Sequence, residues 1–255
     1  MPARPRFVLF GDSITQQAFD VDRRGWAAQL ANRYARRVDV VNRGYSGWNT
    51  SWALYVQDAL FRADGDTQGP LLATVMLGSN DMAENEHQGV DVETYEANMD
   101  KLLQGFAALP PAARPQHVVV LTPPPVDEDA WRKYREATSS GAVDRHNERA
   151  KLFAEASVRA ANRAKVPVID LWTGMQLAMP NGAWKKALTD GLHLDAAGND
   201  YLFRSLVALL DANPALHVDA IAPDAPLDMY KTHVVPDKPI SKLPVRVSPL
   251  ARRKM

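Results

Sequence analysis

The repeated alternation between short apolar runs and stretches of helical periodicity is the feature that most constrains how this chain folds. The apolar runs lack a strict two-residue alternation, which is typical of strands that are buried on both faces. This β–α rhythm predicts an α/β fold, a parallel sheet with helices on both sides. The predicted strands span 6–10, 38–41, 71–77, 117–122 and 166–170, and the predicted helices cover about 26–34, 50–61, 94–108, 143–164 and 196–211.

Length and composition fit one large α/β domain. The chain has 255 residues, of which 46% are hydrophobic and 24% are charged. Its formal net charge of +0 argues against a dedicated nucleic-acid binder. The count of 0 Cys excludes disulfides, thiolate metal sites and a cysteine nucleophile.

The sequence also bears on where the protein acts. Its first apolar run, Phe7–Phe10, is shorter than the core of a signal peptide, and no stretch approaches the roughly 20 apolar residues of a spanning helix. We therefore expect a cytoplasmic protein without an integral membrane segment, whose partner is a small molecule rather than a nucleic acid.

The character of the chain changes after about residue 212. The last 44 residues hold 7 of the 18 prolines, and 229–255 carries seven Lys or Arg against one acid, Asp237. We predict a catalytic domain at 1–211 and a Pro-rich basic tail at 212–255. A solvated extended arm is the favoured interpretation. The alternatives are an arm that wraps a second subunit, giving a homo-oligomer, and an arm that docks to an anionic membrane or another protein.

Ser13 follows the first predicted strand within the stretch FGDSIT. A hydroxyl is a poor nucleophile unless a base takes its proton, and the base usually needs an acid to orient it. The stretch TDGLHLDAAGN, 189–199, offers both, because Asp190 and His193 stand three residues apart. The carboxylate can then hold one ring nitrogen while the other faces the serine. Such pairs also arise by chance, so the spacing alone does not decide the role.

Two further loops follow predicted strands. In NRGYSGWNT, 42–50, Gly44 and Gly47 permit a backbone N–H to be aimed at an anion. The alternative is a tight turn before a helix capped by Asn49 or Thr50. In LGSND, 77–81, the Asn80 amide can donate to a developing oxyanion, although turn chemistry alone also favours Asn here.

Aromatic and apolar residues in or beside these loops are candidates for a substrate pocket. They are Tyr45, Trp48, Trp52 and Met82. For Trp52 the simpler explanation is that the side chain packs a helix onto the sheet.

Taken in order, the segments GDSI (11–14), GYSGWNT (44–50), GSND (78–81) and DGLH (190–193) resemble the four blocks of the GDSL or SGNH hydrolases. The resemblance covers about residues 6–211. Within the family, RGYSGWNT, LTPPPVDE (121–128) and DLW (170–172) are similar to the isoamyl acetate-hydrolysing esterase-like proteins. One departure is Ile14 in place of Leu, a change that conserves volume.

The resemblance implies a three-layer α/β/α flavodoxin-like fold with a five-stranded parallel sheet in the order 2-1-3-4-5. It implies that Ser13 is the nucleophile, His193 the general base and acid, and Asp190 the residue that orients the histidine. The oxyanion hole would comprise the backbone N–H groups of Ser13 and Gly47 and the amide of Asn80. The expected reaction is hydrolysis of carboxylic esters, short-chain acetate-type esters above all, with no metal or organic cofactor.

Other functions stay open from the sequence. A carbohydrate deacetylase, a thioesterase or a lysophospholipase would use the same triad. A flavodoxin-like binding module without chemistry is disfavoured, because neither G-x-G-x-x-G nor G-x-x-x-x-G-K-[ST] occurs in the chain.

Overall fold

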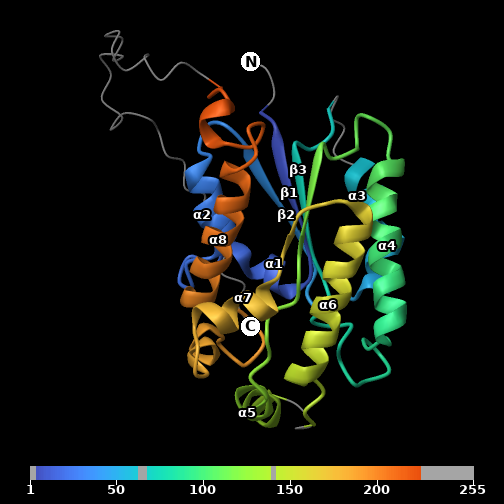
Figure 1. Cartoon of the computed structure of the whole chain (residues 1–255), viewed down its shortest axis with the longest axis vertical. Coiled ribbons are helices and arrows are strands. Elements are labelled where there is room, and N and C mark those ends of the chain that lie inside the picture. The colour runs from blue at the N-terminus through green and yellow to red at the C-terminus, as the bar shows by residue number, and fades with distance from the viewer. Residues whose placement is uncertain (1–3, 63–67, 139–141, 225–255) are drawn as a thin grey trace, which may run out of the picture. The chain divides into compact units, whose positions relative to one another are not determined.

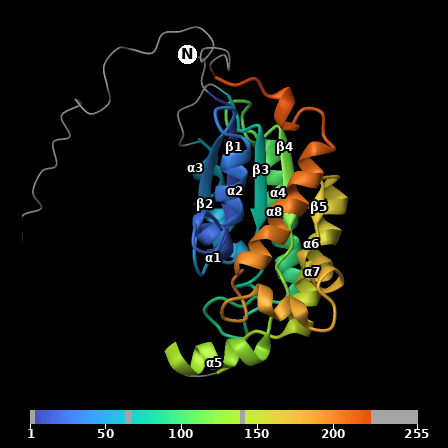
Figure 2. The ribbon, with the colours of Figure 1, turned by 90° about the vertical axis from the view of Figure 1, so that its left-hand side faces the viewer.

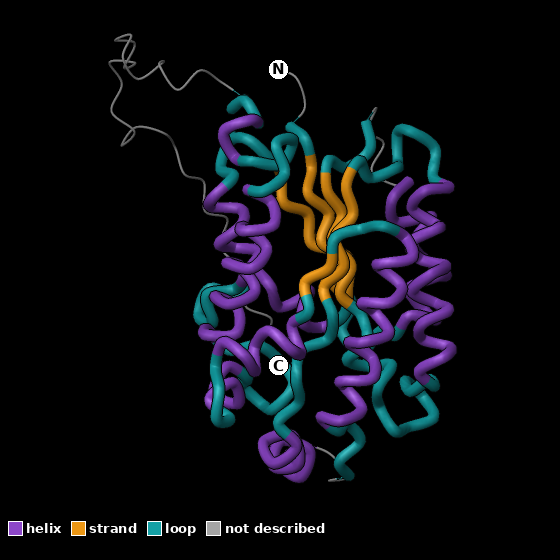
Figure 3. Tube along the Cα trace, in the orientation of Figure 1, coloured by secondary structure: helices purple, strands orange, loops and turns teal. Residues whose placement is uncertain are grey.

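A five-stranded parallel sheet forms the centre of the computed structural model, which describes residues 4–62, 68–138 and 142–224. The sheet order is β2-β1-β3-β4-β5, and every neighbouring pair is parallel. Both the α/β class and the predicted order are therefore confirmed. The strands are β1 (Arg6–Gly11), β2 (Asp39–Gly44), β3 (Leu72–Met76), β4 (His117–Leu121) and β5 (Val168–Ile169), drawn in orange between the purple helices in Figure 3.

The inner strands β1, β3 and β4 are largely apolar because their two faces pack into two separate cores. In β1, Phe7 and Leu9 belong to one hydrophobic cluster, whereas Val8 and Phe10 belong to the other. Successive side chains of a strand point to opposite faces, so a sheet covered on both sides needs apolar residues at nearly every position. This explains why the strands could be recognised without an alternating pattern.

The helices form a layer on each side of the sheet (Figures 1 and 2). The clusters that pack on the two faces draw on different helices. One layer holds α1 (Ser13–Gln16), α2 (Trp26–Arg33), α7 (Leu171–Ala178) and α8 (Ala196–Asp211), and the other holds α3 (Thr50–Arg62), α4 (Val92–Ala108) and α6 (Asn147–Ala164). All five predicted helices are present as α2, α3, α4, α6 and α8.

Several short elements have no counterpart among the predictions. Helix α5 (Glu128–Thr138) lies at the carboxyl end of the sheet (Figure 2) and buries only Trp131 among its residues. Its sequence is mostly charged, so it lacks the apolar periodicity that reveals a packed helix. The other unpredicted elements are α1, α7 and the 3₁₀ helices η1 (Gln17–Phe19), η2 (Ala183–Ala187) and η3 (Val218–Ala220).

The segment after α8 differs from the expected tail. Leu216 and Ile221 are buried in the core cluster that covers α8, and the Tyr34 hydroxyl donates to the Leu216 carbonyl at 2.7 Å. The first compact unit accordingly extends to Asp224 rather than ending at residue 211. These two apolar residues pack without helical periodicity, so the sequence pattern did not reveal them. The rest of the predicted tail, 225–255, lies outside the described residues.

Across the described ranges, no helix combines the length and apolar content that crossing a bilayer requires.

Candidate active site

Ser13 is the first residue of α1, directly after β1 at the carboxyl edge of the sheet. The turn is tight, because a Cβ on Gly11 would lie 2.4 Å from the Met76 carbonyl oxygen of β3. The Asp12 side chain caps α1 by accepting from the Ile14 N–H at 3.0 Å. Strand β1 lies between β2 and β3, so Ser13 sits at the topological switch point where open α/β sheets bind ligands.

His193 connects Ser13 with Asp190. Its Nε2 lies 2.8 Å from the Ser13 Oγ, and its Nδ1 lies 2.6 Å from Asp190 Oδ2. The other carboxylate oxygen of Asp190 accepts from the backbone N–H groups of Leu192 and His193, both at 2.9 Å. One short loop therefore fixes the acid and the ring together, 180 residues along the chain from the serine.

This loop depends on Gly191. Its φ of +93° lies in the region that favours glycine, and a Cβ there would come within 2.4 Å of the Asp127 carbonyl oxygen. The loop is thereby pressed against the start of α5, where the Asp127 N–H donates to the Gly191 carbonyl at 2.9 Å.

The electrostatics of Asp190 suit a charged partner for the imidazole. Burial raises the pKa of this carboxyl, but the hydrogen bond and charge of His193 and the two backbone N–H groups outweigh it, so the pKa is lowered overall. Asp190 is thus ionised at neutral pH and accepts from the His193 Nδ1–H, which leaves Nε2 free to accept the serine proton. The Asp190 and His193 side chains are each 15% exposed, whereas Ser13 is 4% exposed.

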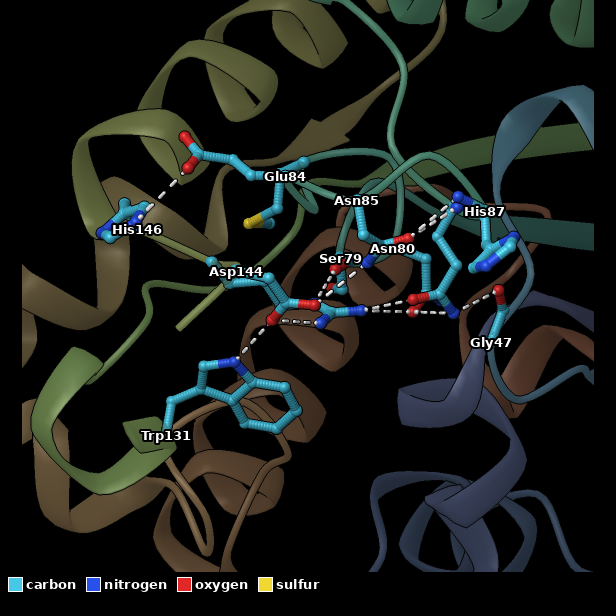
Figure 4. A network of polar contacts seen from close by, with 12 residues as sticks. Gly47, Ser79, Asn80, Glu84, Asn85, His87, Trp131, Asp144 and His146 are labelled. Atoms are coloured by element: carbon cyan, nitrogen blue, oxygen red, sulfur yellow. Dashed lines mark hydrogen bonds and ion pairs between the residues drawn. The ribbon is translucent and has the colours of Figure 1, made fainter. Parts of the chain in front are cut away.

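On the other side of the site, the loops after β2 and β3 are joined through Asn80. This side chain is 4% exposed, and its Nδ2 donates to the Trp48 carbonyl at 2.9 Å. Gln88 Nε2 donates to the Gly47 carbonyl at 3.0 Å and approaches Asn80 Oδ1 at 3.4 Å. Figure 4 shows Asn80 and Gly47 in this network of polar contacts. An amide has two N–H groups, so Asn80 retains one besides the one that Trp48 engages.

The loop after β2 also contacts α1 directly. The Ser46 N–H donates to Gln16 Oε1 at 2.8 Å, and the Tyr45 N–H donates to the Gly11 carbonyl at 2.8 Å. Asn49 caps α3, since its Oδ1 accepts from the Trp52 N–H at 3.0 Å. The turn and the helix cap that the sequence suggested therefore occur in the same loop.

Comparison with known proteins decides the family. The model of the GDSL-like lipase/acylhydrolase family matches residues 9–201, which is most of the chain. The chain belongs to this family. The GDSL-family protein is accordingly a carboxylic ester hydrolase.

Curated relatives support the same family and indicate a subgroup within it. The isoamyl acetate-hydrolyzing esterase 1 homolog of Mus musculus is 38% identical over 211 residues, which cover 81% of this chain and 82% of the relative. The GDSL esterase/lipase WDL1 of Oryza sativa subsp. japonica is 37% identical over 243 residues and covers 91% and 90% of the two chains. The predicted similarity to the isoamyl acetate-hydrolysing group is thus confirmed.

Solved structures agree on the fold. A lipase/acylhydrolase from Enterococcus faecalis aligns with a TM-score of 0.61 at 22% identity, covering 87% of this chain and all of that one. A carbohydrate acetylesterase from Sinorhizobium meliloti aligns with a TM-score of 0.57 at 20% identity, covering 82% and 99%. At these identities the likeness concerns the fold alone.

The predicted pocket residues lie in different surroundings. Tyr45 and Trp48 are partly exposed and their rings stack at 4.4 Å between centroids. Trp52 is 41% exposed on α3, so it does not serve as a core residue. Met82 is fully buried within the cluster that covers α3, α4 and α6. Of the candidates, only Tyr45 and Trp48 therefore lie half-exposed in a loop that contacts α1.

Two acidic residues beneath this edge carry raised pKa values. Burial raises the pKa of Asp12 to about 6 and that of Asp81 to about 7. Asp81 Oδ1 accepts from the Thr50 N–H at 2.9 Å, which ties the loop after β3 to the start of α3. The floor of the site is therefore a region where negative charge is costly.

Sequence reasoning missed the residues that surround Asn80 from behind. Arg145 and Asp144 are 3% and 5% exposed and come from the segment before α6. Trp131 comes from α5 and lies beside Asp144 (Figure 4). Arg145 Nη2 donates to Asn80 Oδ1 at 3.1 Å. In the sequence this arginine stands among other charged residues, DRHNER, and nothing in that pattern distinguishes it from a solvated side chain.

Proposed function

We propose that this GDSL-family protein hydrolyses short-chain carboxylic esters, of the acetate type, through an acyl-enzyme on Ser13. The observation that carries the proposal is the continuous contact from Ser13 Oγ through His193 to Asp190, with distances of 2.8 and 2.6 Å. A nucleophile, a base and an orienting acid within hydrogen-bond reach are the parts that ester hydrolysis at a serine requires.

In the first half of the reaction, His193 Nε2 takes the Ser13 proton as Oγ attacks the ester carbonyl carbon. The tetrahedral intermediate collapses, the imidazolium returns its proton to the leaving alcohol, and the acyl group stays on Oγ. In the second half, a water molecule gives its proton to Nε2 and attacks the acyl carbon, releasing the carboxylic acid and restoring the serine. Asp190 holds the ring and stabilises its positive charge in both halves.

The negative oxygen of each intermediate would be bound by the N–H groups of Ser13 and Gly47 and by Asn80 Nδ2. Supporting this, the Gly47 loop contacts α1 through Ser46, and Gln88 links it to Asn80. Fixed N–H donors of this kind stabilise an oxyanion without having to reorganise during the reaction.

The acyl preference is inferred from the relatives named after isoamyl acetate hydrolysis. Tyr45 and Trp48, stacked on each other in the loop that contacts α1, are the residues that we expect to bound the acyl or alcohol group. Stacked aromatic rings form rigid apolar walls that suit a small substrate.

The test is a series of p-nitrophenyl esters from acetate to octanoate, assayed with the wild type, Ser13→Ala and Ser46→Ala. We expect the highest kcat/KM for acetate and a loss of nearly all turnover in Ser13→Ala at an unchanged melting temperature. Ser46→Ala removes an exposed serine from a neighbouring loop and should retain activity. Near wild-type turnover by Ser13→Ala would contradict the nucleophile, and a preference for octanoate would contradict the short-chain assignment.

Parallel assays with acetylated sugars, acyl-CoA thioesters and lysophospholipids distinguish the other functions open to the same triad. A cytoplasmic location and a homo-oligomer formed through the C-terminal tail stay predictions from the sequence, since the tail beyond Asp224 lies outside the described residues.

A further inference from the structure

The Arg145 guanidinium is buried behind Asn80 and each of its nitrogens donates to a different group. Nε donates to the Ser79 carbonyl at 2.8 Å and Nη1 to Asp144 Oδ1 at 2.9 Å. Nη2 donates to both Asn80 Oδ1 and Gln88 Oε1 at 3.1 Å. The planar fork of arginine matches such a divergent set of acceptors, which a lysine ammonium cannot reproduce.

Further contacts, from Trp131 and Asp144, fix the position of Arg145. Its guanidinium lies 5.0 Å above the Trp131 ring, and the Trp131 indole N–H donates to Asp144 Oδ1 at 2.9 Å. Asn85 Nδ2 donates to the other Asp144 oxygen at 3.0 Å. Burial raises the pKa of Asp144, but the Arg145 charge and these donors outweigh burial, so the pKa is lowered overall. The pair therefore stays ionised and fixed in place.

These contacts decide which way the Asn80 amide faces. In the observed orientation Oδ1 meets a cationic donor and Nδ2 meets the Trp48 carbonyl. A rotation by 180° would bring an N–H against the guanidinium and an oxygen against a carbonyl, which loses both bonds and creates two repulsive contacts. The oxygen and the nitrogen of this buried amide thus have one favourable arrangement.

We propose that Arg145 is a positioning residue for catalysis, which aims and polarises the Asn80 amide so that its second N–H binds the oxyanion. Withdrawal of electron density at Oδ1 makes the N–H a stronger donor, because hydrogen bonds in series strengthen one another. The inference rests on the proposed oxyanion role of Asn80 and adds to it a residue 65 positions further along the chain.

The experiment is a double-mutant cycle of Arg145→Lys and Asn80→Ala, followed with p-nitrophenyl acetate. Removing one oxyanion donor typically lowers the rate about 10²- to 10³-fold. We expect Arg145→Lys to lower kcat and kcat/KM by about 10-fold or more, with KM changed less than about twofold, since the donor acts in the transition state. In the Asn80→Ala background the same substitution should change the rate by less than about twofold.

Arg149→Lys is the matched control. Arg149 also holds the loop after β3, donating to the Met82 and Val90 carbonyls at 2.7 and 3.0 Å, and its guanidinium lies 5.2 Å above the Phe153 ring. Neither of these hydrogen bonds, nor the ring contact, involves Asn80. We expect Arg149→Lys to lower the melting temperature as Arg145→Lys does, while kcat stays near the wild-type value.

If Arg145→Lys fails to fold, the pair D144N/R145Q enters the same cycle, because it leaves no unpaired buried charge. Equal losses from Arg145→Lys in both backgrounds, or an equal loss of kcat in Arg149→Lys, would overturn the inference and leave the proposed function intact. A wild-type rate in Asn80→Ala alone would instead overturn the oxyanion assignment on which it rests.

Discussion

The two sides of Ser13 are organised differently. On the imidazole side, Asp190 and His193 lie three residues apart, contact each other directly and are each 15% exposed. On the amide side, Asn80 is 4% exposed, and its orientation depends on buried residues from distant segments, Arg145 above all. In the proposed mechanism, the group that exchanges protons is held by its neighbours in sequence and is partly exposed, whereas the group that only donates is buried and is held by residues from distant segments.

Among the predicted changes, Asp190→Asn on the imidazole side should have the largest effect on kcat. An amide N–H facing His193 Nδ1 would force the ring proton onto Nε2, so that the ring could no longer accept from Ser13. We expect kcat to fall by about 10³- to 10⁴-fold with little change in KM. Steady-state assays with p-nitrophenyl acetate measure this.

The matched control is Asp195→Asn, at the cap of α8, where the side chain accepts from the Ala196 N–H. This acid lies five positions from Asp190, and its replacement should leave kcat within a few-fold of the wild type. Activity of Asp190→Asn comparable to that of the control would show that the imidazole needs no carboxylate partner.

On the amide side, Asn80→Ala should lower kcat less than Asp190→Asn does. Two backbone donors would remain in the proposed oxyanion hole, so we expect kcat to fall by about 10²- to 10³-fold, or about 2.7–4 kcal/mol. Asn85→Ala, which removes a donor to Asp144, should have a smaller effect than Asn80→Ala. The reverse order would place the important donor elsewhere.

The smallest effect concerns stability at the floor of the amide side. The pKa of Asp81 rises to about 7 in the folded protein because of burial, against an ordinary value near 3.8 in the unfolded chain. Between these values the folded state keeps a proton that the unfolded state has lost, so stability falls as pH rises through this window. Asp81→Asn removes the penalty while Oδ1 still accepts from Thr50.

We therefore expect Asp81→Asn to melt at a higher temperature than the wild type at pH 8, with a gain that shrinks toward pH 4. A gain of about 1 kcal/mol corresponds to about 2–4 °C in a domain of this size. Asp58→Asn, at an exposed carboxylate on α3, controls for the loss of one surface charge. A gain for Asp81→Asn that is larger at pH 4 than at pH 8 would reverse the assigned sign.

The features that the sequence could predict are those that leave a pattern along the chain. Strands with two buried faces, and helices such as α8 with one, leave apolar patterns that follow the chain, so the fold class was predictable from those patterns. The order of the sheet was predictable only from the resemblance to the family. Ser13, Asp190 and His193 stand in short motifs whose spacing already places the acid beside the ring. The structure brings these three together, and their catalytic roles stay a prediction.

Other features depend on tertiary contacts that no local pattern encodes. Arg145 was missed because a buried arginine and a solvated one have the same neighbours in sequence. Helix α5 was missed because it buries one tryptophan and is otherwise charged. The burial of Leu216 and Ile221 after α8 was missed because two isolated apolar residues in an irregular segment form no periodic signal.

The account depends most on the reactivity of one hydroxyl, and labelling with a fluorophosphonate followed by peptide mapping tests it without assuming a substrate. We predict a single modified peptide that contains Ser13, formed quickly by the wild type and much more slowly by His193→Ala. Modification of a different residue, or an equal labelling rate in Ser13→Ala, would contradict the proposed nucleophile.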